Sequence, residues 1–152
     1  VCIDDRWLYE REAELDEIAP VDLRDIRPRV RREGSDLTLV GTGNGAAMCE
    51  ATADLLEEVS CEVIDVPVIN PMTDSDWAVI RESHARTGRL LVVDGAWGSC
   101  GWAATVMAAV GGGKAMTLPA TPAPTSGGLE ADFYRPLQAE SVAATAREMC
   151  GA

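Results

Sequence analysis

Short apolar runs alternate with longer amphipathic segments from Asp36 to the end of the chain. Short apolar runs predict buried strands, and apolar residues spaced three and four apart predict helices that cover a sheet. Strands are expected at 37–40, 61–66, 89–94 and 114–118. Helices are expected at 44–58, 74–86, 102–110 and 139–149, with a short helical piece near 129–134. This order predicts right-handed βαβ crossovers and a three-layer α/β sandwich, in which a mainly parallel, roughly five-stranded sheet has helices on both faces.

The helix ends and helix faces refine this expectation. Thr73 or Asp74 can cap the second helix, and Gly88 can end it. In the first helix Ala47, Ala51 and Leu55, with Met48 and Val59 alongside, are expected to form one apolar stripe that lies on the sheet. In the last helix the buried side is expected to consist of Val142, Ala143, Ala146 and Met149.

The N-terminal residues differ in character from the rest. Residues 1–33 lack a clear period and contain two prolines, so we expect a connecting arm ahead of a domain at 34–152. The chain begins like the end of a buried strand, Val1-Cys2-Ile3, and is therefore expected to be a piece of a longer protein. Five arginines between residues 23 and 32 leave two interpretations open: a solvated arm lying over the domain, or a basic patch that docks an acidic partner.

Charge and cysteine content narrow the classes of partner. With 13 Lys and Arg against 25 Asp and Glu, the net charge of -12 opposes attraction to phosphate backbones and anionic lipids. No apolar run approaches the ~20 residues that cross a bilayer. Neither nucleic acid nor membrane is therefore expected as a partner. The five cysteines are odd in number and form no CxxC pair, which indicates reduced thiols and a cytoplasmic protein.

A glycine-rich turn follows the first predicted strand, where ligands of parallel sheets usually bind. Gly41-Thr42-Gly43-Asn44-Gly45-Ala46 fits GxGxxA, and Asp65 ends the next strand, where a ribose-binding acid belongs in dinucleotide sites. Three interpretations stay open: a structural turn, a contact with a small anion or substrate at Gly43, Asn44 and Gly45, and a dinucleotide site.

Other motifs carry no convincing chemistry. Gly111-Gly112-Gly113-Lys114 lacks the earlier glycine and the following Ser or Thr of a phosphate loop. His84 is the only histidine and lies near a predicted helix end, where the helix dipole alone explains it. We therefore expect neither catalytic residues nor a metal site.

Trp97 and Trp102 flank a glycine-rich loop after the third strand of the domain. Large aromatic side chains at a ligand-binding edge are costly to leave in water. The two tryptophans are expected to form a subunit interface, and packing into the core is the alternative.

Several segments together resemble the C-terminal domain of the transketolase family, and within it the β subunit of the E1 component of 2-oxoacid dehydrogenases. The domain segments that carry this resemblance are 32–40, 61–65, Asn70-Pro71-Met72 and 87–97. The arm at 3–9 and a late proline-rich region, with 122–126, Leu129-Glu130 and 133–136, also resemble the family. The sequence departs from the family pattern around Gly111 to Lys114, where the helix extension and linker are shortened.

The resemblance implies an enzyme that uses thiamine diphosphate and Mg²⁺ to decarboxylate pyruvate or a branched-chain 2-oxoacid. The acyl group then passes to the lipoyl group of an E2 acyltransferase. In the family the activating glutamate and the active-site histidine belong to an upstream pyrimidine-binding domain, which would precede Val1. The resemblance therefore implies that this chain alone is inactive and that its residues bind neither cofactor.

The implied role of the domain is assembly with an E1 α subunit, a second β subunit and E2. Trp97, Gly98, Gly101 and Trp102 match the family's glycine-rich interface loop, and the family's suggested regulatory anion would bind at the Gly43–Gly45 turn. Two alternatives stay open. One is the equivalent domain of a transketolase or a 1-deoxyxylulose-5-phosphate synthase, and the other is a free-standing nucleotide- or anion-binding module.

Overall fold

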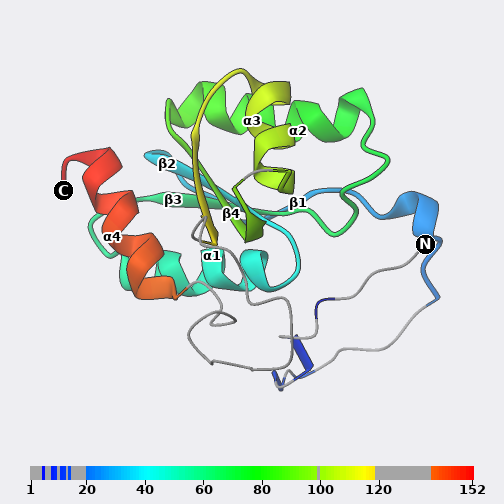
Figure 1. Ribbon diagram of the computed structural model, residues 1–152, viewed down its shortest axis with the longest axis horizontal. Helices are drawn as coiled ribbons and strands as arrows, with labels where there is room; N and C mark the ends of the chain where they lie inside the picture. Colours follow the sequence, from blue (N-terminus) through cyan, green and yellow to red (C-terminus); the bar gives the residue numbers. More distant parts are fainter. Residues whose placement is uncertain are drawn as a thin grey trace.

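The computed structural model describes residues 5, 8–9, 11–12, 14, 20–98, 100–118 and 138–152. It contains one five-stranded sheet in the order β1-β3-β2-β4-β5 (Figure 1). The pairs β2·β3, β2·β4 and β4·β5 are parallel, and β1 is antiparallel to β3. The strand bounds are β1 Arg29–Arg32, β2 Leu37–Gly41, β3 Cys61–Asp65, β4 Leu90–Trp97 and β5 Lys114–Leu118. The predicted α/β class and mainly parallel sheet are confirmed.

Helices α1 and α4 cover one face of the sheet and α2 and α3 cover the other, which gives the three expected layers (Figure 1). The helices are α1 Asn44–Leu55, α2 Asp74–Thr87, α3 Trp102–Val110 and α4 Ala139–Cys150, preceded by the short helix η2 Leu23–Asp25. The side chain and backbone of Thr73 form a capping box with Asp76 at the start of α2. Gly88 and Gly111 end α2 and α3 in the left-handed conformation. The helical piece expected near 129–134 lies outside the described residues.

Strand β1 differs from the prediction, since the sequence indicated only a connecting arm there. All four of its residues are exposed, and three of them are arginines. No alternation of apolar and polar residues could announce such a strand, because it lies at the edge of the sheet and buries little. Its place depends on pairing with β3, with Val30 opposite Ile64.

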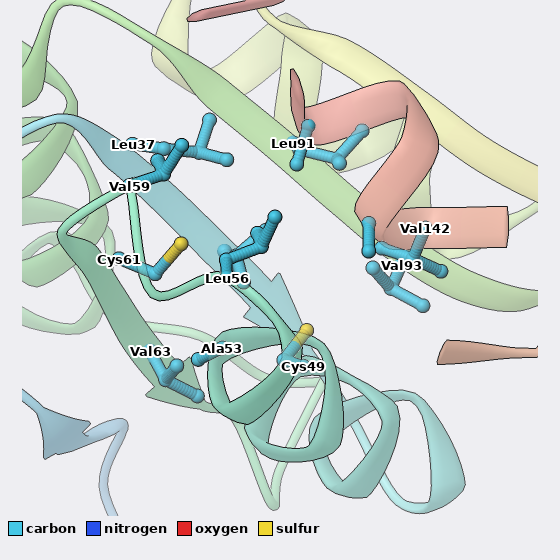
Figure 2. Packing of buried hydrophobic residues seen from close by; sticks show 13 residues of the cluster. Leu37, Cys49, Ala53, Leu56, Val59, Cys61, Val63, Leu91, Val93 and Val142 are labelled. Atoms are coloured by element: carbon cyan, nitrogen blue, oxygen red, sulfur yellow. The ribbon is translucent and has the colours of Figure 1, made fainter. Parts of the chain in front are cut away.

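A separate apolar core lies on each face of the sheet. Figure 2 shows the cluster on the α1 and α4 face, where side chains from β2, β3 and β4 meet both helices. This cluster consists of Leu37, Leu39, Cys49, Ala53, Leu56, Val59, Cys61, Val63, Leu91, Val93, Val142, Ala143 and Ala146. The cluster on the α2 and α3 face consists of Val40, Ile64, Val66, Ile80, Leu90, Val92, Ala103 and Val106. The core face predicted for the last helix is confirmed, with Met149 packing partly buried against it.

The stripe predicted for α1 is wrong in its three central residues, although Val59 lies in the core cluster and Met48 packs against it. Leu55 is 43% exposed, and Ala47 and Ala51 are half-buried. The residues that are buried are Gly45, Ala46, Cys49, Thr52 and Ala53. A Cβ atom on Gly45 would lie 2.4 Å from the Val93 carbonyl oxygen, so the first turn of α1 sits directly against β4. This close approach, rather than the largest side chains, sets which face of the helix is buried.

Candidate functional site at the carboxyl ends of the strands

The β2–α1 turn is shaped by close backbone approaches. A Cβ on Gly41 would lie 2.4 Å from the Ala46 amide nitrogen, closer than real Cβ contacts come. Gly43 has a φ of 53°, a left-handed conformation that favours glycine. The glycines of the GxGxxA pattern therefore have structural reasons to be there, whether or not the turn also contacts a ligand.

The first amide of α1 already binds a carboxylate of the same chain. The Asn44 backbone N–H donates to Asp5 Oδ2 at 2.7 Å. A Cβ on Gly43 would lie 2.8 Å from that oxygen, so the absence of a side chain leaves room for it. The helix N-terminus predicted to attract an anion is thus occupied by the N-terminal arm.

Asp65 at the end of β3 also faces the arm. Burial raises the pKa of its carboxyl, while the positive charges of Arg31 and Arg29 act in the opposite direction. Arg29 is the register partner of Asp65 in the sheet, and Arg31 Nε donates to Glu50 Oε1 of α1 at 2.9 Å. A ribose-binding acid should be open to its ligand. The arm thus approaches both features of the proposed dinucleotide site, which weighs against that alternative.

Four of the five arginines between residues 23 and 32 have acidic partners within the chain. Arg24 pairs with Asp22, Arg31 with Glu50 and Arg32 with Asp54. Arg27 lies 3.6 Å from Asp76 of α2. These pairs favour the interpretation of an arm lying over the domain rather than a free basic patch.

The β4–α3 loop is organised by a residue that the sequence analysis did not single out. Asp94 is 5% exposed, and its Oδ2 accepts from the Ala103 N–H at 2.8 Å while Oδ1 accepts from the Ala96 N–H at 3.1 Å. A Cβ on Gly101 would lie 2.5 Å from the Trp97 carbonyl oxygen. The sequence contains a signal for this role: Asp94 follows an apolar run and precedes a glycine. A short acidic side chain at such a position can reach the N-terminus of the next helix.

The four residues predicted for the interface lie together around this loop. Trp97 ends β4 and Trp102 begins α3, both half-buried, while Gly98 is exposed and Gly101 is buried. Trp102 packs against the α2 and α3 core cluster. Within the described part of the chain its indole Nε1 is buried without a hydrogen-bond acceptor. The geometry places the loop beside the β2–α1 turn, since β2 and β4 are paired, but it leaves the interface role a prediction.

Groups with metal-binding or nucleophilic chemistry are not assembled into a site in the described residues. No three His, Cys, Asp or Glu there could hold a metal ion together. His84 is half-buried on α2, and a Cβ on Gly112 would lie 3.5 Å from its ring. Burial raises the pKa of the Cys49 thiol above its usual range and raises that of Cys61 to about 11, which makes both thiols poor nucleophiles.

None of the helices in the described residues is long and apolar enough to cross a membrane.

The comparisons with known proteins agree with this architecture. Residues 27–147 match the family model described as the transketolase C-terminal domain. The chain belongs to this family. The match includes β1 and continues into α4, so it covers the whole sheet of the transketolase C-terminal domain seen here.

Three relatives illustrate the similarity within the family. The chain is 27% identical over 113 residues to the 2-oxoisovalerate dehydrogenase subunit beta of Dictyostelium discoideum, covering 72% of this chain and 30% of that protein. It is 34% identical over 116 residues to the 2-oxoisovalerate dehydrogenase subunit beta 2 of Arabidopsis thaliana, again covering 72% and 30%. It is 34% identical over 131 residues to the acetoin:2,6-dichlorophenolindophenol oxidoreductase subunit beta of Cupriavidus necator, covering 79% and 38%. The resemblance to E1 β subunits is confirmed, and the chain spans about a third of these relatives.

A solved structure shows the same fold. A split-gene transketolase, described as an inactive beta4 tetramer, superposes with a TM-score of 0.66 at 22% identity. The superposition covers 86% of this chain and 45% of that chain. At this identity the similarity supports the fold alone.

Proposed function

We propose that this chain is the C-terminal assembly domain of the β subunit of a thiamine-diphosphate-dependent 2-oxoacid dehydrogenase, and that it has no catalytic activity alone. The observation that carries the proposal is the family match over residues 27–147, together with E1 β subunits among the relatives. The contacts at the carboxyl ends of the strands are consistent with the absence of a catalytic site in this chain. Carboxylates of the chain itself occupy amides at the N-termini of α1 and α3, where a substrate anion would otherwise bind.

The residues described here do not fit the expected cofactors. Mg²⁺ requires several oxygen ligands, and a diphosphate requires free N–H or cationic donors. The described residues assemble no group of acids able to hold a metal, and the first amide of α1 is bonded to Asp5. We propose that thiamine diphosphate and Mg²⁺ bind to other parts of the assembled enzyme.

The proposed partners are an E1 α subunit, a second β subunit and the E2 acyltransferase. The loop with Trp97, Gly98, Gly101 and Trp102 is the proposed subunit interface, because it brings two half-buried tryptophans to the carboxyl-end edge. Neither nucleic acid nor membrane is proposed as a partner, in view of the net charge of -12. A cytoplasmic location is proposed because Cys49, Cys61, Cys100 and Cys150 are free thiols.

The test is reconstitution. We would measure sedimentation of this chain alone, and then with an E1 α subunit and the upstream β domain supplied as a separate polypeptide. Thiamine-dependent decarboxylation of pyruvate and of 2-oxoisovalerate would be measured on each sample. We expect a complex and activity only in the mixture, and the preferred oxoacid would identify the substrate.

Two results would contradict the proposal. Decarboxylation or tight thiamine diphosphate binding by the chain alone would place a catalytic site in it. Complete failure of the chain to associate with both partners would contradict the assembly role. The variant with both Trp97 and Trp102 replaced is the matched negative control.

The equivalent domain of a transketolase is the second candidate, because the family model that matches residues 27–147 is described as the transketolase C-terminal domain. In that case the mixture should transfer ketol groups between sugar phosphates and should leave 2-oxoacids unreacted. The two candidates are thus separated by the substrate that the reconstituted complex consumes.

A further inference from the structure

Helix α1 begins without a cap from its own sequence. Its N-cap residue is Gly43, which has no side chain, and its first turn contains no acidic residue. The Gly45 N–H donates to the Thr42 carbonyl and the Ala47 N–H to the Gly43 carbonyl. The first amide, that of Asn44, requires an acceptor from elsewhere, since the N-terminal amides of a helix have no partner within it.

The other helices start differently. Helix α2 has the capping box of Thr73 and Asp76 within its own segment. Helix α3 takes its carboxylate from Asp94 of the preceding strand β4, nine residues before the Ala103 amide. Helix α1 takes its carboxylate from Asp5, which is 39 residues away along the chain.

The distances around Asp5 show how its side chain fits this position. Its Oδ2 lies 2.7 Å from the Asn44 amide nitrogen, where the positive end of the helix dipole favours a negative charge. A Cβ on Gly43 would lie 2.8 Å from Oδ2 and 3.0 Å from the Asp5 Cβ, so any larger residue would push the side chain away. The free Asn44 amide and the absence of a side chain at Gly43 together accommodate a carboxylate at this position.

We propose that the N-terminus of α1 is a docking site for the carboxylate of Asp5, and that this bond fixes the upstream arm on the domain. The arm has a second attachment where it enters the sheet as β1: Arg27 faces Asp76 of α2, and Arg31 of β1 pairs with Glu50 of α1. The arm is therefore held at both ends of the segment between residues 5 and 31. A free anion must displace Asp5 to reach the turn at Gly43, Asn44 and Gly45.

The experiment uses the 152-residue chain and follows hydrogen exchange of the Asn44 amide. We expect Asp5→Ala to speed exchange about fivefold or more, as loss of a helix cap does. The matched control is Glu14→Ala, which removes an exposed acid from the same arm with the same change in charge. Sodium acetate at about 0.5 M should slow exchange again in Asp5→Ala, whereas sodium chloride at equal concentration should not, because a free carboxylate replaces the tethered one only at high concentration.

A second measurement needs no variant. A through-hydrogen-bond coupling between the Asn44 amide nitrogen and the Asp5 carboxyl carbon should be detectable by NMR in the unmodified chain. The Gly45 amide, bonded to the Thr42 carbonyl at 2.9 Å, is the internal reference. Absence of the Asp5 coupling where the reference is observed overturns the proposal, as does an Asp5→Ala variant that folds and exchanges at the unmodified rate. If Asp5→Ala does not fold, the coupling alone decides.

Discussion

Strand β3 has an acid near each end, and the two acids are in opposite situations. Near the amino end, burial opposes ionisation of Glu62, yet the Ser83 hydroxyl, the Arg86 guanidinium and the Gly34 N–H hold its pKa below the usual 4.5. At the carboxyl end, burial raises the pKa of Asp65, and Arg31 and Arg29 only partly offset it. The acid near the amino end thus has partners that favour its charge, whereas the acid at the carboxyl end is charged at a cost.

The surroundings of the two acids explain the difference. Near Glu62 the polar groups are closed within the domain: the Thr38 hydroxyl lies 2.6 Å from Ser83 Oγ and 2.8 Å from Thr87 Oγ1, and all three residues are buried. At the other end of the sheet, the polar contacts reach outward to the arm and to the Trp97–Trp102 loop. One end of the sheet is therefore built for stability, and the other meets the rest of the chain and the proposed partners.

Replacing both Trp97 and Trp102 by Ala should have the largest effect, on assembly. We expect loss of any self-association and of binding to the partner subunits, with the fold retained, because the loop is the proposed interface. Sedimentation velocity measures association, and circular dichroism measures folding. The control is Leu55→Ala on α1, where Leu55 is 43% exposed, and this change should leave association unchanged. An unfolded double variant would favour the core-packing alternative.

Thr38→Val tests the amino end of the sheet. The substitution keeps the shape but leaves the buried Ser83 and Thr87 hydroxyls without their shared partner, at a cost of about 1–3 kcal/mol. Urea unfolding should show a lower midpoint with the same slope, and association should not change. Thr105→Val, at an exposed position of α3, should stay within about 0.5 kcal/mol of the original. An unchanged midpoint for Thr38→Val would show that the hydroxyl contacts add nothing.

Glu62→Gln should cost about 1 kcal/mol at pH 7, because the Arg86 pairing and a charged acceptor for Ser83 are lost. The folded pKa of Glu62 lies below its unfolded value, so the contribution is present above about pH 4.5 and is lost as the pH falls through the folded pKa. The free energy of unfolding should therefore drop less with acid in Glu62→Gln than in the original. Glu57→Gln, at an exposed position, is the control for the removal of one carboxylate.

Asp65→Asn should have the smallest effect and the opposite sign. The folded pKa of Asp65 lies above its unfolded value, so the ionised carboxylate reduces stability as the pH rises through this range. Removing the charge should raise the free energy of unfolding at pH 7 by a few tenths of a kcal/mol. The gain is small because the variant also loses the attraction of the carboxylate to Arg29 and Arg31. Chemical denaturation at pH 7 and pH 4 measures the difference, and a clear loss of stability at pH 7 would show that the arginine pairing outweighs burial.

The sequence by itself determined the order of the elements and most of their ends. Apolar runs identified β2, β3 and β4, because a strand covered on both faces is mostly apolar along its length. The partly apolar run at 114–118 identified the edge strand β5. Local chemistry identified the cap at Thr73 and the stop at Gly88, since caps depend on residues a few positions apart. The order and spacing of family segments identified the transketolase C-terminal domain, which the family match confirms.

Only the tertiary structure decided the features that depend on distant partners. Strand β1 exists because β3 offers it a backbone edge, and its arginine-rich sequence has no strand pattern of its own. The buried face of α1 follows from contact of Gly45 with β4, and the caps of α1 and α3 come from Asp5 and Asp94. Periodicity shows which residues of a segment face the core and which face water. It does not show which distant side chain will accept from a helix amide, or which backbone will lie against a helix, because these partners meet only when the chain folds.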